Sequence, residues 1–168
     1  MGLDGLAERL RGYRQQGARF AKWREVYSID KHAPTQHGIE ANAEMLARYA
    51  AVCQAEGVVP IVEPEVLMDG DHDIERHAEA TEAVQHAVFH ALHRHNVSLE
   101  LMMLKPNMVL PGKDCRRAEP GEVAAKHFIR PRPATDRLAC MAWQDGERTS
   151  CATGPAQACT AQSSGHAG

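Results

Sequence analysis

Residues 101–110 read LMMLKPNMVL, an apolar run that ends in a lysine and a proline. With Leu99 just before it, the run predicts a buried strand, because strands covered on both faces of a sheet are nearly continuous in apolar residues. Lys105 at the end of such a strand is costly to desolvate. Burial beside a second cation favours the neutral amine, so the position of this lysine favours a nucleophilic role.

The chain before this run alternates between strand and helix patterns. Strands are predicted near residues 19–27, 58–63 and 99–105, and helices over 3–16, 39–56 and 73–95. Gly17 and Gly57 end the first two helices, and Asp73 can cap the third. Pro60 is unfavourable inside the second strand. The alternation predicts an α/β fold with parallel strands and right-handed helical crossovers.

Each predicted strand places a charged residue at a similar level of the sheet, within the strand or at its end: Lys22, Glu63 and Lys105. Glu63 follows Lys22 by 41 positions, and Lys105 follows Glu63 by 42. The carboxyl ends of parallel strands form the active-site face of a βα barrel. Chance is the simpler explanation for any one charge at a solvated strand end. Three charges at one period favour a site.

Four blocks of the sequence carry a family resemblance: GLDGLAERL, GARFAKWREV, NAEMLARYAAVCQAEGVVPIVEPEVLMDGDHDIERH and LMMLKPNMVLPG. In their order and spacing over roughly residues 2–125, they resemble class I fructose-bisphosphate aldolase, the lysine-dependent type that uses no metal. The resemblance implies a partial (β/α)8 barrel that holds the fourth to sixth strands. It also implies that no cofactor is required.

The same resemblance implies roles for five residues. Lys105 is expected to be the Schiff-base lysine, and Glu63 the general acid/base. Lys22 is expected to assist proton transfer and bind substrate phosphate, Glu65 to lie in the same site, and Arg24 to lie near a phosphate. The implied reaction is the reversible cleavage of fructose 1,6-bisphosphate to dihydroxyacetone phosphate and glyceraldehyde 3-phosphate, a step of glycolysis and gluconeogenesis.

Residues 126–168 are rich in Pro, Gly, Ser, Thr and Ala without a sustained period, which predicts a disordered tail. Three amino-terminal strands of the family and its later phosphate loop have no counterpart in the sequence. We therefore expect a partial aldolase barrel over 1–125 and an unrelated or frame-shifted tail. Two interpretations stay open: an aldol-cleaving enzyme, and a catalytically inactive truncated remnant.

The composition limits the classes of molecule that the chain is expected to bind. The 168 residues carry a net charge of −3, which gives no support for nucleic-acid binding, and no apolar run of about 18 residues predicts a membrane span. Five cysteines without a C-x-x-C pair favour the reducing cytoplasm. A phosphorylated ketose is the expected ligand. The family is commonly homo-oligomeric, and open sheet edges favour self-association of this chain.

A metal site on the third predicted helix is a distant alternative. His86, His90 and His93 recur on one face of that helix, within reach of a shared ion. A solvated helix face is the simpler explanation, because no carboxylate or cysteine completes the set.

Overall fold

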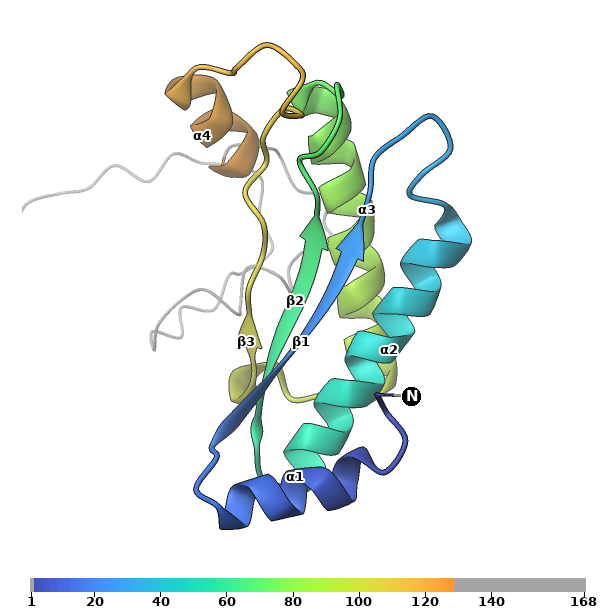
Figure 1. The fold of residues 1–168 in the computed structure, drawn as a ribbon, viewed down its shortest axis with the longest axis vertical. Coiled ribbons are helices and arrows are strands. Elements are labelled where there is room, and N and C mark those ends of the chain that lie inside the picture. Colours follow the sequence, from blue (N-terminus) through green and yellow to red (C-terminus); the bar gives the residue numbers. More distant parts are fainter. Residues whose placement is uncertain (1, 129–168) are drawn as a thin grey trace, which may run out of the picture.

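The computed structural model describes residues 2–128. One sheet of three parallel strands, in the order β1–β2–β3, lies against long helices (Figure 1). The elements are α1 (Leu6–Gln15), β1 (Phe20–Tyr27), α2 (Gln36–Ala55), β2 (Val59–Val66), α3 (Ile74–Arg94), the 3-10 helix η1 (Leu99–Leu101), β3 (Met103–Leu104) and α4 (Pro120–Phe128). The predicted α/β class with parallel strands and helical crossovers is confirmed.

Local sequence sets the helix ends. The Thr35 side chain accepts a hydrogen bond from Gly38 N at 3.1 Å, so α2 begins three residues before the predicted start. Asp73 accepts from Arg76 N at 2.7 Å and caps α3 as predicted. Gly57 follows α2 with φ 68°, a left-handed conformation that glycine adopts without strain.

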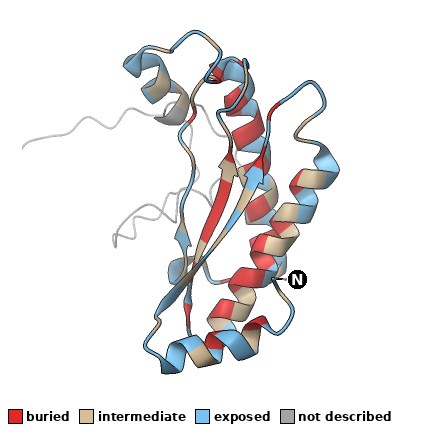
Figure 2. Cartoon of the chain, viewed as in Figure 1, coloured by how far each residue is buried: buried red, intermediate tan, exposed pale blue. Residues whose placement is uncertain are grey.

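The alternation of side chains along the strands gives the sheet two unlike faces. Tyr27 and Val62 lie on the helix side of the sheet and are buried with residues such as Leu46 of α2. Figure 2 shows buried positions on both the strands and the long helices. The opposite face is open to solvent in the described part of the chain: Phe20 is 64% exposed and Met103 is 52% exposed. We refer to this second side as the open face.

The prediction of a buried strand over residues 99–105 is wrong in two respects. The first three residues form η1, and only the two residues of β3 pair with β2. The apolar side chains are also not buried, since Leu101 and Met103 are exposed and their neighbours are only partly covered.

Two prolines of β2 explain why β3 is short. The bond from Lys105 N to Val62 O, 2.9 Å long, shows that even-numbered residues of β2 direct their backbone groups toward β3. Pro60 and Pro64 are even-numbered and have no N–H to donate. The ladder is therefore confined to Ile61 and Val62, which lie between the two prolines. Pro60 is tolerated because it pairs with Ala21 of β1, while its nitrogen, which has no N–H, faces the side on which no residue of β3 pairs with it.

The predicted tail lies almost wholly outside the described residues. Its residues 126–128 continue α4, and the remainder of the prediction stays a prediction. Among residues 2–128, no helix is long and apolar enough to cross a membrane.

Two buried histidines lie where β2 leads into α3. The ring centroids of His72 and His77 are 5.4 Å apart, and neither ring nitrogen of His72 has a hydrogen-bond partner among the described residues. Burial lowers the pKa of His72, against the opposing charges of Asp71 and Asp73. Burial also lowers the pKa of His77, and His72 lowers it further. Both rings are therefore held neutral in the folded chain.

The free energy of unfolding should fall as the pH drops below 6.5, the ordinary histidine pKa. The unfolded chain binds more protons than the folded chain between that value and the lowered pKa, so stability rises with pH in this window. His72→Phe retains a packed ring and removes one of the two titrating groups. It should abolish about half of this pH dependence in urea unfolding. His93→Asn, at an exposed position of α3, is the control, and equal pH dependence in both variants would contradict the assignment.

Candidate active site

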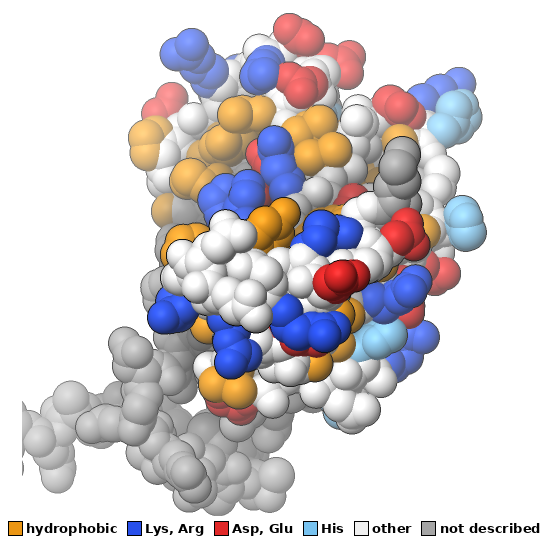
Figure 3. All heavy atoms as spheres, turned by 60° about the horizontal axis from the view of Figure 1, so that its bottom comes forward, with side chains coloured by type: hydrophobic (Ala, Val, Ile, Leu, Met, Phe, Trp, Pro, Cys, Tyr) orange, Lys and Arg blue, Asp and Glu red, His pale blue; other side chains and the backbone are white. Residues whose placement is uncertain are grey.

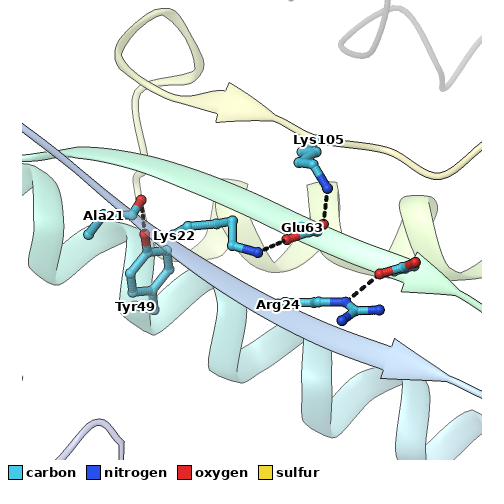
Figure 4. A network of polar contacts seen from close by, with 7 residues as sticks. Ala21, Lys22, Arg24, Tyr49, Glu63 and Lys105 are labelled. Carbon is cyan, nitrogen blue, oxygen red and sulfur yellow. Dashed lines mark hydrogen bonds and ion pairs between the residues drawn. The ribbon is translucent and has the colours of Figure 1, made fainter.

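The register of β1 on β2 assembles the predicted site residues. Arg24 lies opposite Glu63 in the parallel pairing, and positions two residues apart share a face. Lys22, Arg24, Glu63 and Glu65 therefore lie together on the open face, and Lys105, directly after β3, reaches the same group (Figure 4). The structure thus brings together all five residues that the sequence singled out.

Glu63 is the centre of the group. Lys22 Nζ donates to Glu63 Oε2 at 2.6 Å, and Lys105 Nζ donates to Glu63 Oε1 (Figure 4). The Glu63 side chain is 3% exposed, whereas the side chains of Lys22 and Lys105 are 48% and 61% exposed. The two ammonium groups thus cover the carboxylate from the solvent side.

The protonation state of Glu63 follows from these contacts. Burial raises its pKa, but the hydrogen bonds and charges of Lys105 and Lys22 outweigh burial, and the net effect holds the pKa below the ordinary 4.5. Glu63 is therefore a carboxylate near neutral pH. It is placed to accept a proton from either lysine.

Arg24 and Glu65 form a second ion pair beside the first. Arg24 Nε donates to Glu65 Oε2 across the two strands. This bond uses one of the five N–H donors of the guanidinium group. Glu65 therefore lies with the other four residues as expected, and it pairs with Arg24 rather than with a lysine.

The apolar enclosure of Lys105 that the run itself predicts is not found among the described residues. Its side chain projects from the open face, where it is largely exposed rather than enclosed by apolar residues. The second cation does not face it directly either, because the Glu63 carboxylate lies between Lys22 and Lys105. The physical reason is that the apolar run supplies one short edge strand and no wall around the amine.

Two supporting residues were not predicted. The Tyr49 hydroxyl, on α2, donates to the carbonyl of Ala21 next to Lys22 (Figure 4), and burial raises the pKa of Tyr49, which keeps the hydroxyl protonated. Its place on the apolar stripe of the predicted helix is a usable signal, since a buried tyrosine needs a polar partner. The other is Asn107, whose contacts with β2 and α3 join distant parts of the sequence.

The alternative of a metal site has no structural support in the described residues. His86, His90 and His93 are exposed on α3. Among residues 2–128, no group of three His, Cys, Asp or Glu side chains is arranged to hold a metal ion.

Comparison with known proteins identifies similar chains. A family model described as fructose-bisphosphate aldolase class-I matches residues 1–131. Fructose-bisphosphate aldolase of Dictyostelium discoideum is 56% identical over 131 residues, which cover 77% of this chain and 37% of that protein. The cytoplasmic isozyme 2 of Pisum sativum is 54% identical over 129 residues, covering 77% of this chain and 36% of that protein.

A solved structure agrees with the sequence comparisons. It holds fructose-bisphosphate aldolase from Plasmodium falciparum in complex with TRAP and a small-molecule inhibitor. The match has a TM-score of 0.71 and 49% identity, and covers 74% of this chain and 37% of that chain. The chain thus spans little more than a third of the length of these relatives.

The two lysines should be redundant partners of Glu63. Lys22→Met or Lys105→Met alone leaves one ion pair, and because both amines are substantially exposed and screened, each should cost less than about 1 kcal/mol. The double variant leaves a buried carboxylate without either cation and should cost about 2 kcal/mol or more near neutral pH. Urea unfolding of the four chains measures this coupling, with Lys113→Met, which removes a surface contact to Asp69, as the control. Simple additivity of the two substitutions would refute the shared role of Glu63.

Proposed function

The chain belongs to the class-I fructose-bisphosphate aldolase family, and on this premise we propose that Lys105, Glu63 and Lys22 form the Schiff-base part of an aldolase site. The observation that carries the proposal is the Glu63 carboxylate in contact with both amines. Fructose 1,6-bisphosphate is the proposed substrate, with dihydroxyacetone phosphate and glyceraldehyde 3-phosphate as products of the lyase reaction. The cytosolic and cytoplasmic isozymes among the relatives support a cytoplasmic location.

The contacts suit each proton transfer that this chemistry requires. Lys105 passes a proton to Glu63, and the free amine then attacks the ketose carbonyl carbon to give a carbinolamine. Glu63 returns the proton to the departing hydroxyl, which leaves as water and gives the imine. The bond between the α and β carbons of the protonated imine then breaks: Glu63, again a carboxylate, takes the proton of the β-hydroxyl, the aldehyde leaves, and the electrons of the bond pass to the imine nitrogen to give an enamine. Glu63 returns that proton to the α carbon, and water hydrolyses the imine to release the ketone product and the Lys105 amine. Lys22 can restore the proton on Glu63 between these steps.

Two cations of the open face, Arg24 and Lys22, are placed to bind the phosphates of the substrate. Arg24 lies on the open face beside the lysines, and Glu65 fixes its guanidinium through Nε. A guanidinium held in this way can present further N–H donors to a phosphate. We assign Arg24 and Lys22 to phosphate binding.

The isolated chain should nevertheless turn over substrate negligibly. Lys105 is 61% exposed on the open face, so water surrounds the amine and little of the surface needed to orient a sugar phosphate is present. Orientation supplies a large part of the rate in such reactions. We therefore propose that the chain retains the reactive residues Lys105, Glu63 and Lys22 but lacks the enclosed pocket that efficient catalysis requires.

Reductive trapping should show whether Lys105 can form an imine even though the chain does not cleave the substrate. Dihydroxyacetone phosphate with borohydride should give a reduced adduct that mass spectrometry locates on Lys105, and Lys105→Met should lack it. Cleavage of fructose 1,6-bisphosphate by the same preparation should stay at the level of the Lys105→Met chain.

Lys113→Met is the matched control, since it removes an exposed lysine of a surface ion pair. Failure to label Lys105 above Lys113 would refute the Schiff-base assignment. Rapid cleavage that Lys105→Met abolishes would instead show that this chain, alone or assembled, is a working aldolase.

We also propose that the chain self-associates through its open sheet edge and open face. Arg19 O and Tyr27 O accept bonds from the β2 side, so the alternate residues of β1 direct their backbone groups away from β2. Figure 3, a view from below, shows hydrophobic side chains at the surface among lysines and arginines. Such an edge favours pairing with another chain.

Sedimentation velocity should show an average mass that rises with concentration. Phe20→Lys places a charge on the open face at the start of β1 and should weaken association about tenfold or more. Tyr13→Lys, at a similarly exposed position on α1, should leave association unchanged. A concentration-independent monomer would exclude this second proposal.

A further inference from the structure

The Asn107 side chain continues the pairing of β2 beyond the point where the backbone ladder stops. The last backbone bond of this ladder joins Lys105 N to Val62 O at 2.9 Å. Pro64 has no N–H for the next bond, and the N–H of Val66 donates to Asn107 Oδ1 at 3.1 Å. A side-chain amide thus takes the place of a strand residue.

A second set of contacts anchors the same amide to α3. Asn107 Nδ2 donates to Thr81 Oγ1 at 3.3 Å and to the carbonyl of Met108 at 3.0 Å. Thr81 is buried on α3, and its hydroxyl also lies 3.3 Å from His77 Nδ1. Asn107 is therefore fixed from two elements, β2 and α3, that both belong to the packed core.

These contacts lie directly beside the amine of the site. The Lys105 side chain has little packing of its own to hold it, as its exposure shows. Its backbone is tied on one side by the bond to Val62 and on the other by Asn107, with Pro106 between them. Farther along, Gly112 N donates to His72 O and ties the segment to the loop before α3.

We propose that Asn107 is a positioning residue that keeps the Lys105 amine in contact with the Glu63 carboxylate. Without its amide, residues 106–111 lose their connection to the end of β2, and the bond from Lys105 N to Val62 O alone holds the Lys105 backbone near Glu63. The inference adds to the proposed aldolase site, on which it rests for its functional meaning. Its test reads the titration of Glu63 rather than imine formation, so the two proposals can fail separately.

The titration of Glu63 reports the Lys105 contact, because that hydrogen bond is among the causes that lower the Glu63 pKa. Carbon-13 NMR of glutamate-labelled chain follows the carboxyl signal, which Glu63→Gln identifies. Asn107→Ala should raise the Glu63 midpoint by roughly half or more of the rise that Lys105→Met produces. In the Lys105→Met background, Asn107→Ala should cause no further change.

Three variants of α3 separate positioning from a general loss of stability. Thr81→Val removes the anchoring hydroxyl and should raise the Glu63 midpoint by less than Asn107→Ala does. Thr81→Ser keeps the hydroxyl and should leave the midpoint at its value in the unsubstituted chain. Val84→Ala disturbs the same buried helix face without removing a hydrogen-bonding group and should leave the midpoint unchanged.

Each outcome decides the proposal. An unchanged Glu63 midpoint in a folded Asn107→Ala chain would overturn it, as would an equal rise in the Lys105→Met background or in Val84→Ala. If Asn107→Ala does not fold, the Thr81 pair decides: equal midpoints in Thr81→Val and Thr81→Ser would overturn the proposal, and a difference would uphold it.

Discussion

Strands β1 and β2 pair over eight residues each in a parallel register that sets Arg24 opposite Glu63. This register determines which side chains lie on the helix side and which lie on the open face, because side chains alternate along each strand. A shift of β1 by one residue would turn Lys22 and Arg24 toward α2 and bring the buried Tyr27 to the open face, while Glu63 and Val62 of β2 would keep their places. The core and the site therefore depend on the same pairing. Neither can be changed independently of the other.

Much of this arrangement could be predicted from the sequence. Period and capping patterns located α2 and α3 to within a few residues, because Thr35, Asp73 and Gly57 act through bonds or dihedral angles only a few residues away. The even spacing of Lys22, Glu63 and Lys105 predicted their meeting, because parallel strands joined by similar crossovers align such positions.

The two errors, the buried strand over residues 99–105 and the enclosure of Lys105, have one cause. The apolar run does not reveal which other segments pack against it. The residues around Met103 look like a buried strand, yet their partner strand contains Pro60 and Pro64, whose missing N–H groups limit the ladder to two residues. The exposure of Lys105 and the anchoring of Asn107 by Thr81 depend on contacts between distant segments. Local patterns contain no signal for either.

The parallel crossover also has a consequence for folding during synthesis. Strand β1 begins at Phe20, but its partner β2 begins at Val59, and the whole of α2 lies between them. At a translation rate of about 5–20 residues per second, β1 waits roughly 2–8 s for the first residues of its partner. Throughout that interval the aromatic and β-branched side chains of β1 can pack only against α1 and the growing α2. The ribosome-bound chain is therefore most vulnerable to mispairing before β2 has emerged.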